Sequence, residues 1–218
     1  MALKTNTELI VLNHTKFGEN SIVVHTLSRV YGRRSFLVRV GKKAAMSLFQ
    51  PLSLLEADIV ENPRATLWNA VSLSVRHPLP GLRGNLYKSA IAVFMSEVLY
   101  RVVRDGGRDD ALFDWCFRQI LTLDALESDF SNFHILFLLG LASALGFSPT
   151  AGELAPFARR HPQELRHLIQ AETGQALLLP LTGQMRGEIC EDILSYLEFH
   201  TDARIEVRSL DVLRELFA

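Results

Sequence analysis

Short apolar runs recur along the first 76 residues and are separated by glycine, proline and polar residues. They cover residues 8–12, 21–27, 34–40, 52–60 and 67–75, and they are rich in valine, isoleucine, leucine and phenylalanine. Such runs, bounded by turn residues, are typical of strands. Because no helical period lies between them, the pattern predicts about five short strands that form a small closed barrel.

Two of these runs alternate between apolar and polar positions. In the third run, Phe36, Val38 and Val40 share one side, so Phe36 is expected to lie in the core. In the fifth run, one side carries Val71, Leu73 and Val75 and the other carries Ser72, Ser74 and Arg76.

The pattern changes at residues 77–81, which read His-Pro-Leu-Pro-Gly. Two prolines and a glycine interrupt both strands and helices, so the domain boundary is placed here. Apolar positions then recur with helical spacing. They predict a helix through Ile91 and Val102 that ends at residues 105–107, and a second through Leu112 and Ile120.

Further helices are expected towards the C-terminus. Residues 133–145 are apolar on nearly every side, which predicts the central buried helix of a bundle. A short helix is expected at 163–170, whereas residues 176–181 fit either a strand or a loop. Residues 186–199 form another helix, and Ser209 is expected to cap the last one. The fold class is therefore α+β, with a barrel domain at 1–78 and an α-helical domain at 79–218.

Charge is unevenly distributed along the chain. The net charge is -1, but residues 1–80 carry ten basic and five acidic side chains, and the remainder carries 13 basic and 19 acidic. This division indicates an anionic partner for the first part, although solvated faces can also differ by chance. The two cysteines fit a reducing compartment, and no apolar run approaches the roughly 20 residues of a membrane span. A cytoplasmic, nucleoid-associated protein is expected.

A basic set interleaved with aromatic residues is the strongest chemical feature. Single-stranded nucleic acid binds where cations follow the phosphates and aromatic rings stack on bases. Ordinary solubilising charge on strand edges is the competing interpretation. The candidate DNA-binding residues are Lys16, Tyr31, Arg33, Arg34, Arg39, Lys42 and Lys43, with Tyr31 as the stacking ring.

No catalytic or metal-binding pattern is found in the sequence. The seven histidines include no pair at metal spacing, and neither a phosphate-binding loop nor a Gly-x-Ser-x-Gly elbow is present. The acidic residues Glu188, Glu191 and Asp192 fit the solvent-exposed face of a helix better than a site for acid–base catalysis. The chain is therefore expected not to be an enzyme and to need no cofactor or metal, although an unrecognised hydrolase remains a weaker alternative.

Several short segments, taken in order, resemble the RecO family of recombination mediators. Residues 7–12 read Thr-Glu-Leu-Ile-Val-Leu and residues 17–21 read Phe-Gly-Glu-Asn-Ser. Residues 38–43 read Val-Arg-Val-Gly-Lys-Lys, and residues 50–56 read Gln-Pro-Leu-Ser-Leu-Leu-Glu. Residues 145–149 read Leu-Gly-Phe-Ser-Pro, residues 196–200 read Tyr-Leu-Glu-Phe-His, and residues 208–213 read Arg-Ser-Leu-Asp-Val-Leu.

The resemblance implies an N-terminal OB-fold and a C-terminal helical domain. It implies binding of single- and double-stranded DNA, annealing of complementary strands, and loading of the RecA recombinase onto DNA coated by single-strand-binding protein. The implied partners are RecR and the C-terminal tail of single-strand-binding protein. A protein-interaction scaffold with only incidental DNA contact is the alternative.

One departure from the family pattern concerns zinc. Many members carry four cysteines after the Leu-Gly-x-x-Pro segment, whereas residues 150–183 contain none. We therefore expect this remnant of a zinc-finger-like region to be held by packing of Leu154, Phe157, Leu165 and Leu168, without zinc. The acidic tail of single-strand-binding protein would need a site with basic residues in the helical domain. Arg118, Arg159 and Arg160 are the candidate cations for it.

Overall fold

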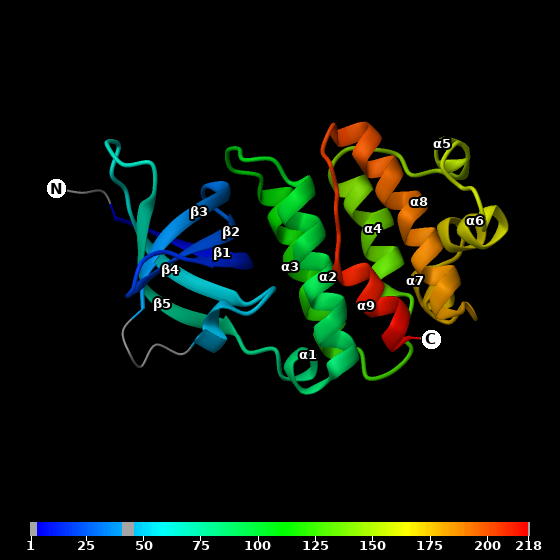
Figure 1. Ribbon diagram of the computed structural model, residues 1–218, viewed down its shortest axis with the longest axis horizontal. Helices are drawn as coiled ribbons and strands as arrows, with labels where there is room; N and C mark the ends of the chain where they lie inside the picture. Colours follow the sequence, from blue (N-terminus) through cyan, green and yellow to red (C-terminus); the bar gives the residue numbers. More distant parts are fainter. Residues whose placement is uncertain (1–3, 41–45, 218) are drawn as a thin grey trace. The chain divides into compact units, whose positions relative to one another are not determined.

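The computed structural model describes residues 4–40 and 46–217 (Figure 1). The chain forms two compact units. One comprises residues up to Leu79 together with Val103–Arg118, and the other comprises Pro80–Val102 together with the residues from Gln119 on. No helix in the described part of the chain is both long and apolar enough to cross a membrane.

The first unit contains five strands that close into a barrel in the order β1-β2-β3-β5-β4. Only β3 and β5 pair in parallel, and the other neighbours pair antiparallel. This arrangement fits an OB-fold and confirms the α+β prediction. The strands are β1 (Lys4–Lys16), β2 (Ser21–Ser28), β3 (Gly32–Arg39), β4 (Leu54–Val60) and β5 (Trp68–His77), and the short helix η1 (Met46–Phe49) precedes β4.

The barrel core is built from inward-facing residues of all five strands. Phe36 is fully buried, as predicted, and Val38 beside it is 3% exposed. They pack with Val11 and Val24 from β1 and β2 and with Ile59 from β4. Burying one such side chain contributes roughly 1.5–3 kcal/mol, so this alternation stabilises the barrel.

The alternation in β5 is broken by a bulge. Glu56 pairs with Ser74 and Asp58 with Val71, so β5 has one residue more than β4 between these pairs. Ser72 takes a positive φ of 55° at this point. Because an extra residue reverses the facing of the side chains, Leu73 packs on the core whereas Val71 lies on the opposite side and is 37% exposed. The prediction that Val71, Leu73 and Val75 share one side was wrong.

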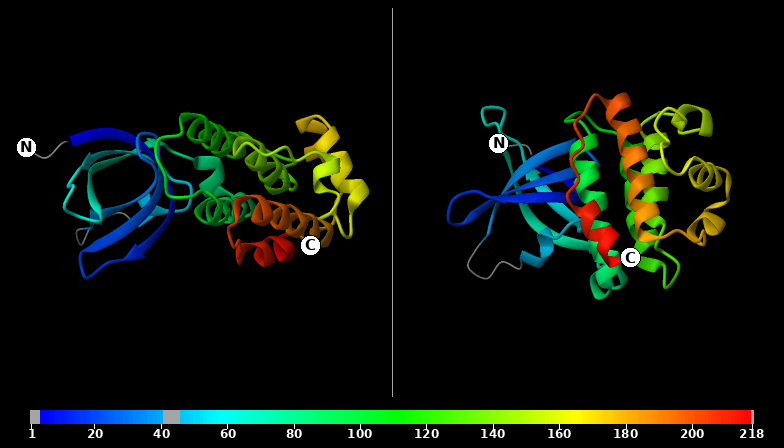
Figure 2. Two further views of the ribbon diagram at one scale, coloured as in Figure 1. Left: turned by 90° about the horizontal axis from the view of Figure 1, so that it is seen from above. Right: turned by 45° about the vertical axis from the view of Figure 1, so that its right-hand side comes forward.

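The helical unit is a bundle in which α4 and α9 both pack against α2 and α8 (Figure 2). α3 begins in the barrel unit and ends in this one. The helices are α1 (Pro80–Gly84), α2 (Leu86–Val102), α3 (Asp110–Ala125), α4 (Phe133–Ala144), α5 (Ala151–Leu154), α6 (Pro162–Gln170), α7 (Thr173–Leu177), α8 (Gly183–Thr201) and α9 (Ser209–Leu216).

The predicted central helix is confirmed, since most of α4 is buried. Residues 176–181, which fitted either a strand or a loop, are mostly a loop, and only the first two residues belong to the end of α7. The amide of Asn132, just before α4, donates to the carbonyls of Ala176, Leu177 and Leu179 at 2.8–3.2 Å. This long-range side-chain contact fixes the end of α7, which local sequence could not indicate.

Residues 150–183 are held by apolar packing, as expected from the absence of cysteine. Leu154 is fully buried, and Leu165 and Leu168 are each 2% exposed. The Phe157 ring lies edge-on to Tyr196 of α8, with the ring centroids 5.6 Å apart. The short helix α5 therefore packs against α6 and α8, and α6 also packs against α7.

The start of the last helix differs from the prediction. Arg208 occupies the N-cap position of α9, and Ser209 is its first helical residue. The Ser209 hydroxyl does not cap its own helix but donates to the Glu97 carboxylate of α2 at 2.7 Å.

Candidate nucleic-acid interface

The strand register separates the predicted cations into two groups at opposite ends of β3. Arg33 and Arg34 pair with Leu27 and Thr26 near the end of β2, whereas Arg39 pairs with Ser21 at its start. Six residues of extended strand span roughly 20 Å, so Arg33 and Arg39 cannot act on the same phosphate.

The cations at the N-terminal end of β3, Arg33 and Arg34, make contacts within the barrel unit. Arg33 forms an ion pair with Asp105. The Arg34 guanidinium lies 3.6 Å from the centroid of the Trp68 ring. The Tyr31 hydroxyl donates to Glu61 at 2.5 Å, and burial together with this carboxylate raises the pKa of Tyr31. Its ring makes T-shaped contacts with Trp68 and Phe36, so Tyr31 packs within the barrel unit.

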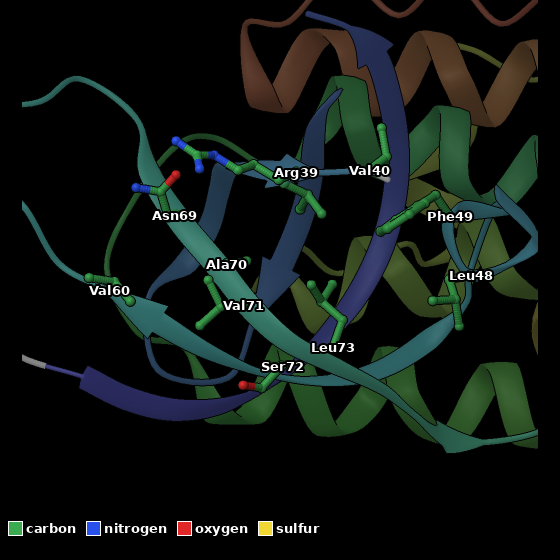
Figure 3. A pocket seen from close by; sticks show the side chains of 11 residues that line it. Arg39, Val40, Leu48, Phe49, Val60, Asn69, Ala70, Val71, Ser72 and Leu73 are labelled. Atoms are coloured by element: carbon green, nitrogen blue, oxygen red, sulfur yellow. The ribbon is translucent and has the colours of Figure 1, made fainter. Parts of the chain in front are cut away.

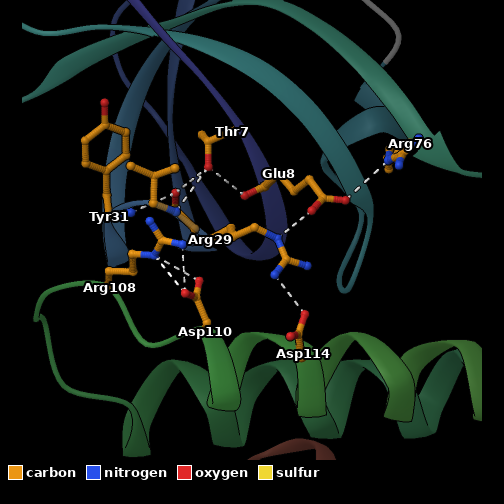
Figure 4. A network of polar contacts seen from close by, with 10 residues as sticks. Thr7, Glu8, Arg29, Tyr31, Arg76, Arg108, Asp110 and Asp114 are labelled. Carbon is orange, nitrogen blue, oxygen red and sulfur yellow. Dashed lines mark hydrogen bonds and ion pairs between the residues drawn. The ribbon is translucent and has the colours of Figure 1, made fainter.

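A second set of ion pairs neutralises the neighbouring surface of the barrel unit (Figure 4). Arg29 contacts Glu8 at 2.5 Å and Asp114 of α3 at 2.8 Å, and its guanidinium lies 4.4 Å from the centroid of the Phe113 ring. Arg76 contacts the other oxygen of Glu8 at 3.2 Å. Arg29 therefore links α3 to the barrel strands, and both cations are paired with acids.

The cations near the C-terminal end of β3, Arg39 and Lys16, are exposed. Lys16 pairs with Ile22, and Arg39 pairs with the adjacent Ser21, so β2 lies between the two cations. Both side chains belong to solvent-exposed residues. Lys42 and Lys43 follow Arg39 in the sequence but lie outside the described residues.

Phe17 is a candidate stacking residue that the sequence reasoning missed. It follows Lys16 at the tip of the β1–β2 hairpin and is 54% exposed. Its backbone N–H donates to the Ser21 carbonyl at 2.9 Å, which places Phe17 opposite the partner of Arg39. Residues opposite one another in antiparallel strands share a face, so Phe17 and Arg39 flank Ser21 about 10 Å apart. The available signal was an aromatic residue between a lysine and the Gly18 turn.

A groove opens beside Arg39, where β3 and β5 separate (Figure 3). In the described strands they pair only at Phe36–Trp68 and Leu37–Asn69. Beyond this point the β3–β5 groove encloses about 570 Å³ and has no carboxylate among its lining residues. The lining is formed by Val38, Arg39, Val40, Leu48, Phe49, Val60, Asn69, Ala70, Val71, Ser72 and Leu73.

The described residues do not fit a zinc site. No group of three or more histidine, cysteine, aspartate or glutamate side chains is arranged to hold a metal within residues 4–40 and 46–217. Cys116 and Cys190 are both buried, and burial raises the pKa of each thiol far above its ordinary value. A thiol that stays protonated is a poor metal ligand.

The closed barrel in the order β1-β2-β3-β5-β4, with cations and an exposed ring at one end, places the chain among OB-fold proteins that carry an additional helical unit. Residues 1–71 match the family described as Recombination protein O N terminal, and residues 83–155 match Recombination protein O C terminal. The chain belongs to the RecO family.

Curated relatives support this assignment along the whole chain. The chain is 34% identical to the DNA repair protein RecO of Bacteroides fragilis, over 95% of this chain and 97% of that protein. Identity to the RecO protein of Phocaeicola vulgatus is 29%, over 96% and 97% of the two chains. For the Flavobacterium johnsoniae protein it is 25%, over 99% and 100%.

Proposed function

We propose that this protein is a recombination mediator that binds single- and double-stranded DNA and anneals complementary strands. Membership of the RecO family supports a role in DNA repair and recombination. We further propose that residues 1–78 act as the DNA-binding domain and residues 79–218 as a domain for protein partners. The protein would act in the cytoplasm, on the nucleoid, and without bond-breaking chemistry.

The observation that carries the proposal is the arrangement of Lys16, Phe17 and Arg39 at one end of the barrel. Two exposed cations flank β2: Arg39 shares one face with the exposed Phe17 ring, and Lys16, opposite Ile22, follows the other face at the same end. Cations that follow the phosphates, with a ring that stacks on a base, are the elements of single-strand binding. Lys42 and Lys43 would add two cations directly after β3.

In this proposal Arg33, Arg34 and Tyr31 are secondary contacts to DNA. Each already has a partner inside the barrel unit, namely Asp105, Trp68 and Glu61. A DNA phosphate would have to compete with Asp105 for Arg33. We therefore assign the primary contacts to Lys16, Arg39, Lys42 and Lys43.

Annealing follows from charge neutralisation. Two DNA strands repel each other through their phosphates, and a protein that binds them releases counterions and lowers that repulsion. The barrel would bring two strands close enough for complementary bases to meet. The base pairs themselves would supply the free energy of the product duplex.

The proposed protein partners are RecR, the C-terminal tail of single-strand-binding protein, and RecA, which would be loaded onto coated DNA. In the helical unit, a groove of about 460 Å³ beside α8 and α9 is lined by Arg159, Arg160 and Arg214 together with apolar Leu194 and Leu210. Glu191, Asp192, Glu198 and Asp211 also line it, so an acidic, partly apolar tail would compete with four carboxylates for the three arginines. Glu191 in the same groove already pairs with Arg160 and Arg214, so the tail would have to displace it.

The test is fluorescence anisotropy of a labelled single strand across a salt series, with annealing followed in the same samples. The double variant Lys16→Glu, Arg39→Glu should bind at least ~10-fold more weakly and reduce the salt slope by about 0.7 for each lost phosphate contact. Arg204→Glu is the matched control, because its side chain is 86% exposed and lies in the helical unit. Unchanged affinity and slope in the double variant would contradict the surface assignment.

The second candidate is an interaction scaffold. The charged groove beside α8 and α9 is the feature that favours it. A scaffold would bind RecR tightly while its DNA binding disappears at physiological salt. Comparing the two affinities in one buffer separates the candidates.

A further inference from the structure

The β3–β5 groove combines an apolar floor with a polar rim. Val38, Phe49 and Ala70 form buried parts of the lining, each about 3% exposed. Arg39 and Asn69 extend side by side from one rim (Figure 3). Within residues 4–40 and 46–217, the lining therefore offers an apolar surface, an amide that can both donate and accept, and one cation, Arg39.

This chemistry fits a planar ring that has a polar edge and carries an anionic group. We propose that the groove is a subsite for one unpaired nucleobase of a DNA strand, with Arg39 on the adjoining phosphate and Asn69 at the polar edge of the base. The inference rests on the proposed DNA binding and makes it more specific. A base within a duplex is paired along that edge and stacked on both faces, so the subsite selects single strands.

Charge and continuity both support this occupant. Arg39 belongs to the groove and also to the row Phe17–Ser21–Arg39. A strand that stacks one base on Phe17 would place a phosphate near Arg39 and direct the next base towards the groove. An apolar peptide side chain would use the floor of the groove but would give Arg39 no anionic partner.

Two positions on β5 provide a matched pair of variants. Val71 lines the groove and is 37% exposed, whereas Val75 lies outside the lining and is 51% exposed. Val71→Trp should fill the groove with an indole ring, and Val75→Trp adds the same ring elsewhere on the same strand. Asn69→Ala is a second groove variant at an exposed position that needs no repacking.

The probes are an intact single strand, the same strand with alternate abasic sites, and a duplex of equal length. The unaltered protein and Val75→Trp should bind the intact strand about 5- to 150-fold more tightly than the abasic strand, which corresponds to ~1–3 kcal/mol per stacked base. Val71→Trp and Asn69→Ala should reduce this ratio while leaving duplex affinity and the salt slope unchanged. Thermal unfolding confirms that each variant is folded.

A direct readout uses 2-aminopurine in the single strand. Its emission should change when the unaltered protein or Val75→Trp binds, and the change should be smaller for Val71→Trp. Equal base dependence in all folded variants would overturn the groove assignment and leave the DNA-binding proposal intact. Failure of the unaltered protein to bind any of the three probes would instead overturn the proposed function. A Val71→Trp variant that loses a protein partner but keeps full base dependence would identify a peptide site and overturn the base subsite.

Discussion

The carboxylate of Glu97 in α2 accepts three hydrogen bonds from the start of α9, including one from the Ser209 hydroxyl at 2.7 Å. The backbone N–H groups of Arg208 and Ser209 donate to the same carboxylate at 3.0 and 3.1 Å. The first N–H groups of a helix have no hydrogen-bond partner within the helix. A carboxylate near this end also interacts favourably with the positive end of the helix dipole. Glu97 therefore caps a helix that begins more than a hundred residues later in the chain.

Replacing Glu97 should destabilise the helical unit. Glu97→Ala removes all three hydrogen bonds at a partly buried site and is expected to lower the unfolding free energy by about 2–3 kcal/mol. Ser209→Ala should lower it by about 1 kcal/mol. Urea unfolding measures both values. Glu215→Ala is the control, because Glu215 is an exposed residue of α9. If Glu97→Ala were no worse than this control, the capping role would be wrong.

Two glycines separate the cost of a positive φ from the cost of a close approach. Gly18 and Gly32 have φ values of 72° and 63°. A Cβ on Gly18 would meet no atom within 4 Å, whereas one on Gly32 would overlap the carbonyl oxygens of Gly106 and Gly107. Gly18→Ala should therefore cost about 1 kcal/mol and Gly32→Ala about 2–4 kcal/mol. Equal losses of unfolding free energy would show that residues 106–107 do not constrain Gly32.

The stability of the helical unit should depend on the protonation of His134. This side chain is buried between Phe94 and Phe217 and faces the Arg186 cation, and desolvation followed by the Arg186 charge lowers its pKa to about 3. Between about pH 6.5 and pH 3 the unfolded chain binds a proton that the folded chain does not. The contribution of neutral His134 to the unfolding free energy is therefore fully present above pH 6.5. Below pH 6.5 the unfolding free energy falls by on the order of 1 kcal/mol per pH unit.

The matched variant is His134→Phe, which keeps an aromatic ring between Phe94 and Phe217. Nδ1 of His134 has no hydrogen-bond partner among the described residues, so the variant should lose little stability at pH 7. Its unfolding free energy should decline less steeply between pH 6.5 and pH 4. An unchanged slope would assign the acid sensitivity to other groups.

The two candidate stacking rings should respond differently to the same substitution. Phe17→Leu removes an exposed ring and should weaken single-strand binding by roughly 1–3 kcal/mol without changing the salt slope. Tyr31→Leu removes a ring packed on Trp68 and should lower the unfolding free energy while leaving DNA affinity nearly unchanged. Anisotropy and urea unfolding of both variants test this. The reverse pattern would restore Tyr31 as the stacking residue.

The sequence alone determined the layout of this protein. The five apolar runs and the apolar α4 are local patterns, and each was sufficient to predict its strand or helix. Burial of Phe36 also followed from period-two alternation. These features could be predicted because backbone conformation and the facing of side chains depend mainly on neighbouring residues.

Only the tertiary structure decided which charges and rings are available at the surface. Arg33 and Arg39 are both arginines of one strand, but Arg33 meets Asp105 from a distant segment whereas Arg39 stays exposed beside the groove. The bulge in β5 and the Glu97 cap of α9 likewise arise between residues far apart in the chain. Local periodicity carries no information about such pairings, because the tertiary fold decides which distant side chains come into contact.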